Sequence, residues 1–440
     1  MKILVVGNGA REHAIAESLK KSKSNPEIIN FATARNPGIS KLASKIEIGK
    51  MLDFEHLKRF AAAEKPDFAV VGPDDPICAG AADALLEIGV KSVAPMKKIA
   101  ALEGSKSFTR ELLKKYEIAG NPLFKSFETE NGLFEFAEKC GEIVVKADGL
   151  CGGKGVFVQG DHFENLSDGL EIAKKLLKKD GRVVLEEKLV GVEFSYLFFC
   201  DGKTLVPMPA VADHKRAFDG DRGPNTGGMG TISDKNHSLP FLEKSDLDAA
   251  AKIAEKSIAA AQAETGETFR GILFGGFMAT KNGVRLIEWN VRFGDPEGLN
   301  LLSLLATDFV EICRAILDGA LSDLDIEFFE RATVCKYVVP DGYPENPVKN
   351  VPIKIDFAKI PDGVKTFFAS IDENENGEMI LKGSRAIGFV ALADTIFAAE
   401  KLAEAATKSV SGPVFHRADI GTEASLAAKK ALSQKIREQF

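Results

Sequence analysis

Apolar runs and amphipathic stretches alternate over the N-terminal part of the chain. Three runs of mostly β-branched and aromatic side chains predict buried strands: Lys2 to Val6, Ile28 to Ala32 and Phe68 to Val71. A helical pattern follows the first run to about Leu19, and another helix is expected from about Ile77, before a strand near Ser92 to Ala94. Because strands and helices alternate, residues 1–100 are expected to form a Rossmann-like domain around a parallel sheet.

The pattern changes after Pro95, and the next helix is expected over Lys97 to Tyr116. Short strands, a glycine-rich loop and a helix near Asn165 to Lys179 predict a small α+β lid over residues 107–190. A central α+β domain is expected over residues 191–328. It should hold the helices Leu247 to Ala263 and Leu299 to Leu317. Its strands Ile272 to Thr280 and Val284 to Asn290 should form a hairpin that turns at Lys281-Asn282-Gly283.

Strand patterns return in residues 329–440, which are expected to form a C-terminal α+β domain. The expected strands and helices of this domain are Thr333 to Val339, Thr366 to Ala369, Ala386 to Ala391, Thr395 to Lys408 and a terminal helix from about Glu423. The fold class is therefore α/β, with a Rossmann-like opening and three further α+β parts.

Composition excludes several classes of protein. The 440 residues are 45% hydrophobic, and the net charge of −7 argues against a nucleic acid or an anionic membrane bound over a broad basic surface. The apolar run at the N-terminus is too short for a signal peptide, and no segment approaches the length of a membrane span, so a cytoplasmic protein is expected. Six cysteines without a C-x-x-C pair suit reduced thiols.

A glycine-rich loop with two lysines lies between two strand-like runs, Ile143 to Val145 and Val156 to Val158. Its backbone can approach anionic oxygens where side chains are absent, and Lys146 and Lys154 add positive charge. It is not a Walker loop, because Asp148 stands where the first glycine of that motif is required. The loop is interpreted as a phosphate-holding loop between strands; an ordinary hairpin turn is the alternative.

The first strand ends in a second glycine loop, Gly7-Asn8-Gly9-Ala10-Arg11-Glu12-His13. The dinucleotide fingerprint requires a third glycine, and the position that it requires is occupied by Glu12. A phosphate or sugar ligand is therefore favoured over NAD at this crevice, although a purely structural βα turn has the same pattern.

Residues 213–230 form a long segment of little periodicity that is rich in cations, amides and glycines. Its basic side chains are suited to holding phosphate or carboxylate groups: His214, Lys215, Arg216 and Arg222. A disordered surface loop is the alternative.

Glu288 and Asn290 are two residues apart on a predicted strand, so they share one face of the sheet. A carboxylate and an amide oxygen there suit Mg²⁺ or Mn²⁺ held jointly with nucleotide phosphates, and a polar outward face is the alternative. The continuation Val291-Arg292-Phe293-Gly294-Asp295-Pro296-Glu297 adds a guanidinium and two carboxylates. Together with the phosphate loop, these residues are suited to ATP-driven activation of a substrate.

The motifs resemble the glycinamide ribonucleotide synthetase family of ATP-grasp ligases over essentially the whole chain. The resemblance rests on these runs: Gly7-Asn8-Gly9 with Arg11-Glu12-His13, Val71-Gly72-Pro73, Gly104-Ser105-Lys106, Lys146 to Leu150, Gly153 to Val156, Asp213 to Arg216, Gly223 to Gly230, Glu288 with Asn290, Arg292 to Glu297, and Arg417 with Asp419 to Gly421. It implies an ATP-grasp architecture and ligation of glycine to 5-phosphoribosylamine through a glycyl phosphate, in a protein expected to be a monomer.

The resemblance assigns residues to ATP and to the metal. Lys106 and Lys146 are expected on the phosphates, and the flap of Gly152, Gly153, Lys154 and Gly155 is expected to close over them, with Lys154 also assigned to catalysis. Glu186, Glu187 and Leu189 are expected to face adenine, Glu193 the ribose, and Glu288 and Asn290 the Mg²⁺ or Mn²⁺.

The resemblance also assigns the two other substrates. Arg292 is expected to stabilise the glycyl phosphate, and Asp213 or Asp295 is expected to meet the glycine ammonium group. The residues expected around phosphoribosylamine are Gly7, Asn8, Gly9, Arg11, Glu12, Asp213, His214, Lys215, Arg216, Asn225, Thr226, Gly227, Gly228 and Met229. Another ATP-grasp ligase of a purine intermediate is the nearest alternative, and a nicotinamide-dependent oxidoreductase is an alternative of a different class.

Three positions depart from the family pattern: Ala10, the pair Cys151-Gly152, and Leu299. Ala10 and Gly152 are small changes that leave backbone approach intact. Leu299 puts in doubt any contact that an amide at this position makes near the metal.

Overall fold

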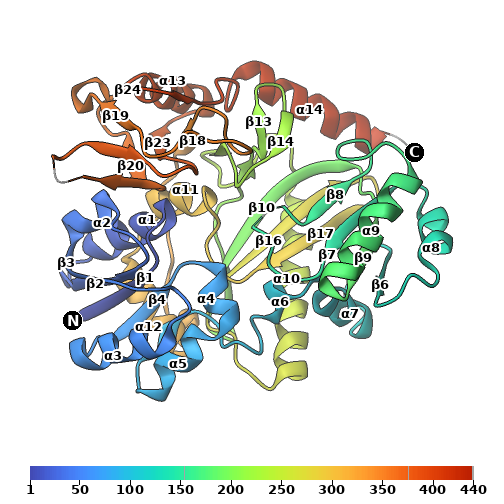
Figure 1. The fold of residues 1–440 in the computed structure, drawn as a ribbon, viewed down its shortest axis with the longest axis horizontal. Helices are drawn as coiled ribbons and strands as arrows, with labels where there is room; N and C mark the ends of the chain where they lie inside the picture. The colour runs from blue at the N-terminus through green and yellow to red at the C-terminus, as the bar shows by residue number, and fades with distance from the viewer. Residues whose placement is uncertain (153, 375, 439–440) are drawn as a thin grey trace.

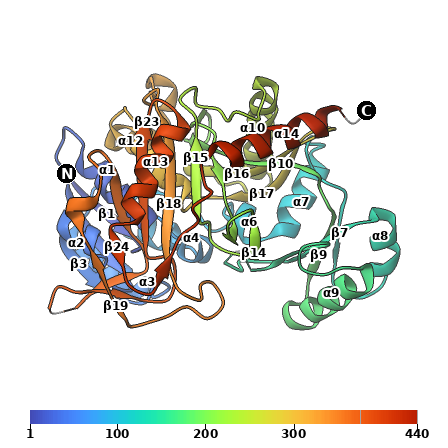
Figure 2. The same cartoon turned by 90° about the horizontal axis from the view of Figure 1, so that it is seen from above.

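The computed structural model describes residues 1–152, 154–374 and 376–438 (Figure 1). The N-terminal part packs beside the C-terminal part at one end of the molecule, and the lid stands at the other end (Figure 2). The central sheet lies between them. None of the helices in the described ranges is both long and apolar enough to cross a membrane.

The N-terminal part is a parallel sheet of order β3-β2-β1-β4-β5, as the alternating pattern predicts. Its elements are β1 (Lys2–Val6), α1 (Ala10–Lys20), β2 (Glu27–Ala32), α2 (Pro37–Leu42), β3 (Ala43–Ile48), α3 (Phe54–Glu64), β4 (Phe68–Val71), α4 (Asp74–Ala79), α5 (Ala81–Glu87) and β5 (Ser92–Val93). The single helix expected from about Ile77 is wrong: two short helices meet at Gly80, whose φ of 108° is open to glycine.

The lid is a sheet of order β6-β9-β7-β8 covered by two helices. Together with the segment that leads to it, the lid consists of α6 (Ala101–Gly104), α7 (Lys106–Lys115), β6 (Phe124–Phe127), α8 (Leu133–Cys140), β7 (Ile143–Ala147), β8 (Val156–Val158), α9 (Leu166–Asp180) and β9 (Val183–Glu187). Apolar residues of α8 and α9 pack on the sheet in a core separate from the main one. The expected strand–loop–strand around the glycine loop is confirmed, since β7 and β8 pair antiparallel.

The central part is an antiparallel sheet of order β11-β10-β16-β17. Its elements are β10 (Gly191–Cys200), β11 (Leu205–Pro207), β13 (Arg216–Phe218), β14 (Arg222–Asn225), α10 (Lys244–Thr265), β16 (Gly271–Thr280), β17 (Gly283–Asn290), α11 (Glu297–Leu304), α12 (Phe309–Asp318) and the 3₁₀ turn η1 (Leu321–Asp323). The predicted hairpin of β16 and β17 is confirmed. The segment 213–230 is not the loop that was expected, because β13 and β14 form a second hairpin inside it.

Two long helices expected from the sequence are each divided in the structure. Lys97 to Tyr116 breaks at Ser105, whose extended backbone and side-chain oxygen cap α7 by accepting a hydrogen bond from the Phe108 N–H. Leu299 to Leu317 breaks in the same manner at Asp308, whose carboxylate accepts from the Val310 N–H at the start of α12. Each break is an N-cap residue inside an otherwise helical pattern.

The C-terminal part is built on a sheet of order β12-β15-β18-β23-β20, with β25 also paired to β18. Its elements are β12 (Ala212–Asp213), β15 (Gly230–Ser233), β18 (Ala332–Pro340), β19 (Pro352–Ile355), the 3₁₀ turn η2 (Phe357–Lys359), β20 (Lys365–Phe368), β21 (Ile371–Glu373), β22 (Met379–Leu381), β23 (Ile387–Ala393), α13 (Ile396–Thr407), β24 (Val410–Ser411), β25 (Val414–Phe415) and α14 (Glu423–Glu438). The strands β12 and β15 come from the central part of the chain. Strands from both sides of the predicted boundary at residue 329 therefore share one sheet.

His13 joins the N-terminal and C-terminal parts. Its imidazole is buried, stacks on Phe368 of β20 and accepts a hydrogen bond from the Phe368 N–H through Nδ1, at 3.1 Å. Burial lowers the pKa of His13 to about 4. Because an unfolded chain keeps the ordinary histidine pKa of about 6.5, the unfolded state binds the proton more readily as the pH falls.

We therefore expect the folded protein to lose stability between about pH 6.5 and about pH 4, by roughly 3 kcal/mol at most from this group. His13→Asn keeps an acceptor for the Phe368 N–H and removes the titration. The free energy of unfolding, measured by denaturant titration across this pH range, should fall less steeply in His13→Asn than in the original protein. Equal slopes would show that His13 does not contribute.

Candidate active site

Glu288 on β17 is the point on which basic side chains from four separate segments converge. Partial burial raises the pKa of its carboxyl group, and the charges that lower it are those of Lys215, Lys106, Lys146 and Arg292. They come from the segment after β12, from the start of α7, from β7 and from the segment after β17. The carboxylate is therefore ionised, and the structure gathers the lysines of the lid, the central sheet and the 213–230 segment around one point.

Asn290 lies beside Glu288 on the same face of β17, because the two residues face Phe274 and Gly276 of β16 in regular register. Its Oδ1 accepts a hydrogen bond from Arg292 at 3.0 Å. Among the residues that the structure describes, no group of three or more His, Cys, Asp or Glu side chains is placed to hold a metal ion. An ionised carboxylate with one amide oxygen fits an ion that takes its remaining ligands from phosphates and water, and not an all-protein site.

Arg292 is held at the border of the N-terminal and central parts. Its guanidinium pairs with buried Glu103 at the end of α6, at 2.9 Å, and its Nε is buried without a hydrogen-bond partner in the described structure. The charges of Glu103 and Asp74 raise the pKa of Arg292 against the effect of its burial. The side chain is a fixed cation with one donor still free.

Lys146 and Glu186 belong to a buried ion triad with Arg110 of α7. Glu186 accepts two hydrogen bonds from the Arg110 guanidinium, at 2.6 and 3.0 Å, and pairs with Lys146 Nζ at 2.8 Å. The two cations keep the pKa of the Glu186 carboxyl group low despite its burial. The Glu186 carboxylate therefore faces α7, and the expected adenine-facing role of Glu186 stays a prediction. Its neighbour Glu187 instead accepts from the Leu123 N–H.

The glycine flap is fastened at its base to the start of α7. Asp148 accepts hydrogen bonds from the Ser107 N–H at 3.0 Å, from Ser107 Oγ at 2.6 Å and from Ser105 Oγ at 3.1 Å. Lys106 Nζ donates to the Gly149 carbonyl at 2.9 Å. At the tip Gly152 and Lys154 are exposed, whereas Gly155 packs against Cys151, and Gly153 lies outside the described residues.

In the glycine loop after β1, the side chain of Glu12 folds back onto the backbone of the loop. Glu12 is buried and accepts from the Gly9 N–H at 2.6 Å and from Arg11 Nε at 2.6 Å. A Cβ on Gly72 would lie 2.1 Å from a Glu12 oxygen, so this side chain fills the space between the two loops. In the structure the Glu12 carboxylate caps α1 and pairs with Arg11, and its predicted substrate contact stays a prediction. Asn8 beside it bonds Thr33.

Two residues of the 213–230 segment that were expected to bind substrate are buried in the structure. The His214 ring lies between the Gly230 carbonyl and Lys429 of α14, and burial together with the Lys429 charge lowers its pKa. Met229 is fully buried, and its backbone N–H and carbonyl bond His214 and Tyr337. The substrate contacts of His214 and Met229 stay predictions.

Lys215 is the basic residue of this segment whose charge lowers the pKa of Glu288 most. It pairs with Glu193 at 3.1 Å, and the charges of Glu193, Glu288 and Asp213 raise its pKa. Thr226 stabilises the turn by bonding the Lys215 carbonyl, and Asn225 lies against the lid at His162.

Asp213 and Asp295 differ in the number of partners that their carboxylates have in the described structure. Asp295 accepts from Tyr337 OH at 2.6 Å and pairs with Arg385 at 3.4 Å. Asp213 accepts only from the His214 N–H, at 2.7 Å, among the bonds of the described residues. Burial and the charge of Glu297 raise the pKa of Asp213 well above its usual range. A cationic group is therefore better accommodated at Asp213.

Sequence reasoning missed Arg385, which stands between β22 and β23. Its NH1 donates to the carbonyls of Gly227, Gly228 and Asp295, at 2.7, 3.1 and 2.7 Å, and its guanidinium stacks on Tyr337. Gly227 leaves room for the guanidinium, since a Cβ there would lie 3.0 Å from it and Arg385 would have to shift. No local pattern marks Arg385, because its partners are distant in sequence. Glu103 was missed for the same reason.

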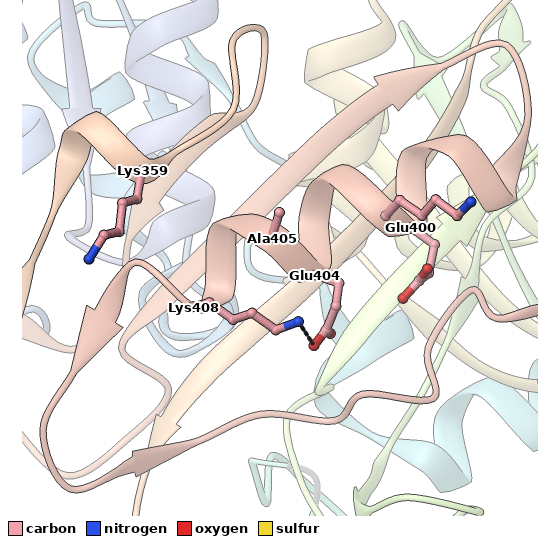
Figure 3. Close-up of a pocket in the computed structure, with 6 residues that line it drawn as sticks. Lys359, Glu400, Glu404, Ala405 and Lys408 are labelled. Carbon is pink, nitrogen blue, oxygen red and sulfur yellow. Dashed lines mark ion pairs between the residues drawn. The ribbon is translucent and has the colours of Figure 1, made fainter.

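A cavity of about 470 Å³ lies away from these residues, on the outer side of α13 (Figure 3). It is lined by Lys359, Glu400, Lys401, Glu404, Ala405 and Lys408. Glu400 and Glu404 are both paired with buried Lys336, each at 2.8 Å. Both carboxylates are thus already bonded to Lys336, and none of the predicted site residues lines the cavity.

The chain is similar along its whole length to known proteins. Family models for the N domain, the ATP-grasp (A) domain and the C domain of phosphoribosylglycinamide synthetase match residues 1–103, 104–298 and 333–423. Phosphoribosylamine–glycine ligase of Methanosarcina barkeri is 46% identical over 424 residues, which are 96% of this chain and 97% of that protein. The enzyme of the same name from Pyrococcus furiosus is 42% identical over 442 residues, 100% of this chain and 99% of that protein.

Solved structures agree with this similarity. The crystal structure of phosphoribosylamine–glycine ligase from Thermotoga maritima has a TM-score of 0.80 at 28% identity, with 95% of this chain and 100% of that chain covered. N5-carboxyaminoimidazole ribonucleotide synthetase from the same organism has a TM-score of 0.63 at 17% identity, with 93% and 98% covered. The second likeness shows the ATP-grasp fold alone.

Proposed function

The chain belongs to the phosphoribosylglycinamide synthetase family, and from this premise we infer that it is an ATP-dependent ligase that joins glycine to 5-phosphoribosylamine in purine biosynthesis. ATP-grasp ligases use ATP with a divalent metal ion. We propose Mg²⁺ or Mn²⁺ as that ion, since both prefer hard oxygen ligands. The products are glycinamide ribonucleotide, ADP and phosphate.

The observation that carries the proposal is the convergence of cations on Glu288. A γ-phosphoryl group spreads negative charge over its oxygens as it is transferred, and fixed positive charge around it lowers the barrier. Lys106 and Lys146 are the proposed phosphate contacts from the lid side. Glu288 and Asn290 are the residues that would hold the metal ion, which supplies positive charge between the phosphates when bound.

We propose that one carboxylate oxygen of glycine attacks the γ-phosphorus of ATP. The bond to the β-phosphate oxygen breaks, ADP leaves, and glycyl phosphate is formed. Arg292 lies beside Asn290 and has an Nε donor without a partner in the described structure, so it is placed to stabilise the charge of this anhydride. The amine of phosphoribosylamine then attacks the glycyl carbonyl carbon, the C–O bond to phosphate breaks, and the amine gives up one proton.

Asp213 is the proposed contact of the glycine ammonium group, because the Asp295 carboxylate is already bonded to Tyr337 and Arg385. Asp213→Asn keeps the shape and removes the negative charge. We expect the KM for glycine to rise about tenfold or more, as a hydrogen bond to a charged group is lost, with the KM for ATP little changed. Steady-state assays with glycine and ATP varied separately check this. A change confined to KM for ATP would refute the assignment.

The proposed function is tested by omission of substrates. ADP release is measured with ATP, glycine and phosphoribosylamine together, and then with glycine or phosphoribosylamine left out. Release is expected to be fast only in the complete mixture. If formate or bicarbonate replaces glycine without loss of rate, the alternative ATP-grasp ligase is correct, and release that needs neither substrate contradicts both.

A further inference from the structure

An ion pair and an amide contact join the lid to the β13–β14 hairpin. Asp161, in the turn between β8 and α9, lies 2.7 Å from the NH2 of Arg216 on β13. Beside it Asn225 of β14 approaches the ring of His162 at 3.4 Å. In Figure 1 the hairpin stands between the C-terminal strands and the lid. Arg216 was expected from the sequence to hold substrate, and in the structure its guanidinium pairs with the lid.

The Arg216 guanidinium is oriented by its own hairpin. Its NH1 donates to the Gly223 carbonyl on the opposite strand at 2.9 Å, which turns NH2 toward Asp161. The pair is partly exposed, with 19% of the Arg216 side chain and 48% of the Asp161 side chain accessible. An ion pair of this kind stabilises a closed arrangement modestly and can still open.

Arg417, after β25, fixes the hairpin from the side opposite the lid. It is only 1% exposed, and its NH1 donates to the Arg216 carbonyl at 3.0 Å and to Asp221 at 2.7 Å. Its remaining nitrogens hold Asp419 at 2.8 and 2.7 Å. Since its acceptors are charged and its surroundings are buried, Arg417 attaches the backbone of Arg216 to the C-terminal part.

We propose that Asp161 and Arg216 form a latch that holds the lid over the candidate active site, and that Arg417 is a positioning residue which keeps Arg216 in place for it. The proposal rests on the proposed function for its consequence. With the latch open, water reaches glycyl phosphate, its oxygen attacks the glycyl carbonyl carbon, and the C–O bond to phosphate breaks. Glycine is regenerated and phosphate is released, so ATP is consumed without product.

Asp161→Asn tests the latch without touching a proposed substrate contact. Loss of a partly exposed ion pair shifts a two-state equilibrium by roughly two- to fivefold, so the ADP released in excess of product should rise by roughly that factor. The KM for ATP should rise in parallel, while kcat for product stays near its original value. Glu164→Gln removes one charge from the same exposed segment of the lid and should leave the excess ADP and the KM for ATP unchanged.

Two further measurements separate the latch from its alternatives. Asp161→Arg combined with Arg216→Asp reverses the pair and should bring excess ADP back toward the original level. Hydrogen–deuterium exchange over residues 156–164 of the substrate-free protein should be faster in Asp161→Asn than in Glu164→Gln, whatever reaction the enzyme catalyses.

The latch is overturned if Asp161→Asn matches the original protein in both excess ADP and exchange, while Arg216→Gln alone raises the KM for phosphoribosylamine. Arg216 would then be the substrate contact expected from the sequence. If no product forms in the original protein, the proposed function fails, and the exchange measurement still decides the latch.

Discussion

Replacement of Glu288 by glutamine is expected to lower turnover by about 100-fold or more, with a weaker response to added Mg²⁺ or Mn²⁺. Glutamine has nearly the same shape, but it cannot supply the negative charge on which Lys106, Lys146, Lys215 and Arg292 converge. Without that charge the metal ion loses its anionic protein ligand, and the cations repel one another. Steady-state rates at several metal concentrations check this.

A matched control is Glu264→Gln on α10, where the carboxylate forms an exposed pair with Lys115. Its turnover and metal response should equal those of the original protein. If Glu288→Gln instead retains its turnover and only melts at a lower temperature, Glu288 serves the packing of the polar face of β17 and is not a metal ligand.

Glu186→Ala should destabilise the fold by about 3–5 kcal/mol, the cost of leaving buried charges without their partner. Arg110 and Lys146 are almost fully buried, and Glu186 is the carboxylate that both of them contact. The free energy of unfolding, measured by denaturant titration near neutral pH, tests this expectation. The loss should appear mainly at the junction of α7 with the lid sheet.

Glu264→Ala is again a suitable control, because it removes an exposed pair with Lys115 of α7 and should leave the free energy of unfolding nearly unchanged. A Glu186→Ala protein as stable as this control would mean that water enters the triad and screens its charges. The triad would then not be the element that joins the lid to α7.

Local sequence patterns predicted the elements that depend on local physics. The β7–β8 loop follows from β-branched flanks, and the β16–β17 hairpin from Asn282-Gly283 at its turn. The helix breaks at Ser105 and Asp308 were missed although each is an N-cap residue type, because the apolar period continues across them. A side-chain cap outweighs that period at a helix start.

The site was predicted as a set of motifs but not as a network of partners. Glu288, Asn290 and Arg292 lie together because they are neighbours on one strand and the segment after it. Arg385 and Glu103, in contrast, reach the site only through the packing of distant parts, and no spacing in the sequence indicates them. The burial of His214 was missed for the same reason, since it depends on α14.

The central claim is that ATP activates the carboxylate of glycine at the site around Glu288. Glycine labelled with ¹⁸O in both carboxylate oxygens tests it most directly, with the released inorganic phosphate analysed by mass spectrometry. The account predicts that one ¹⁸O passes from glycine to phosphate in each turnover, because the oxygen that attacks phosphorus leaves with it. Phosphate free of label, formed together with product, would contradict the claim.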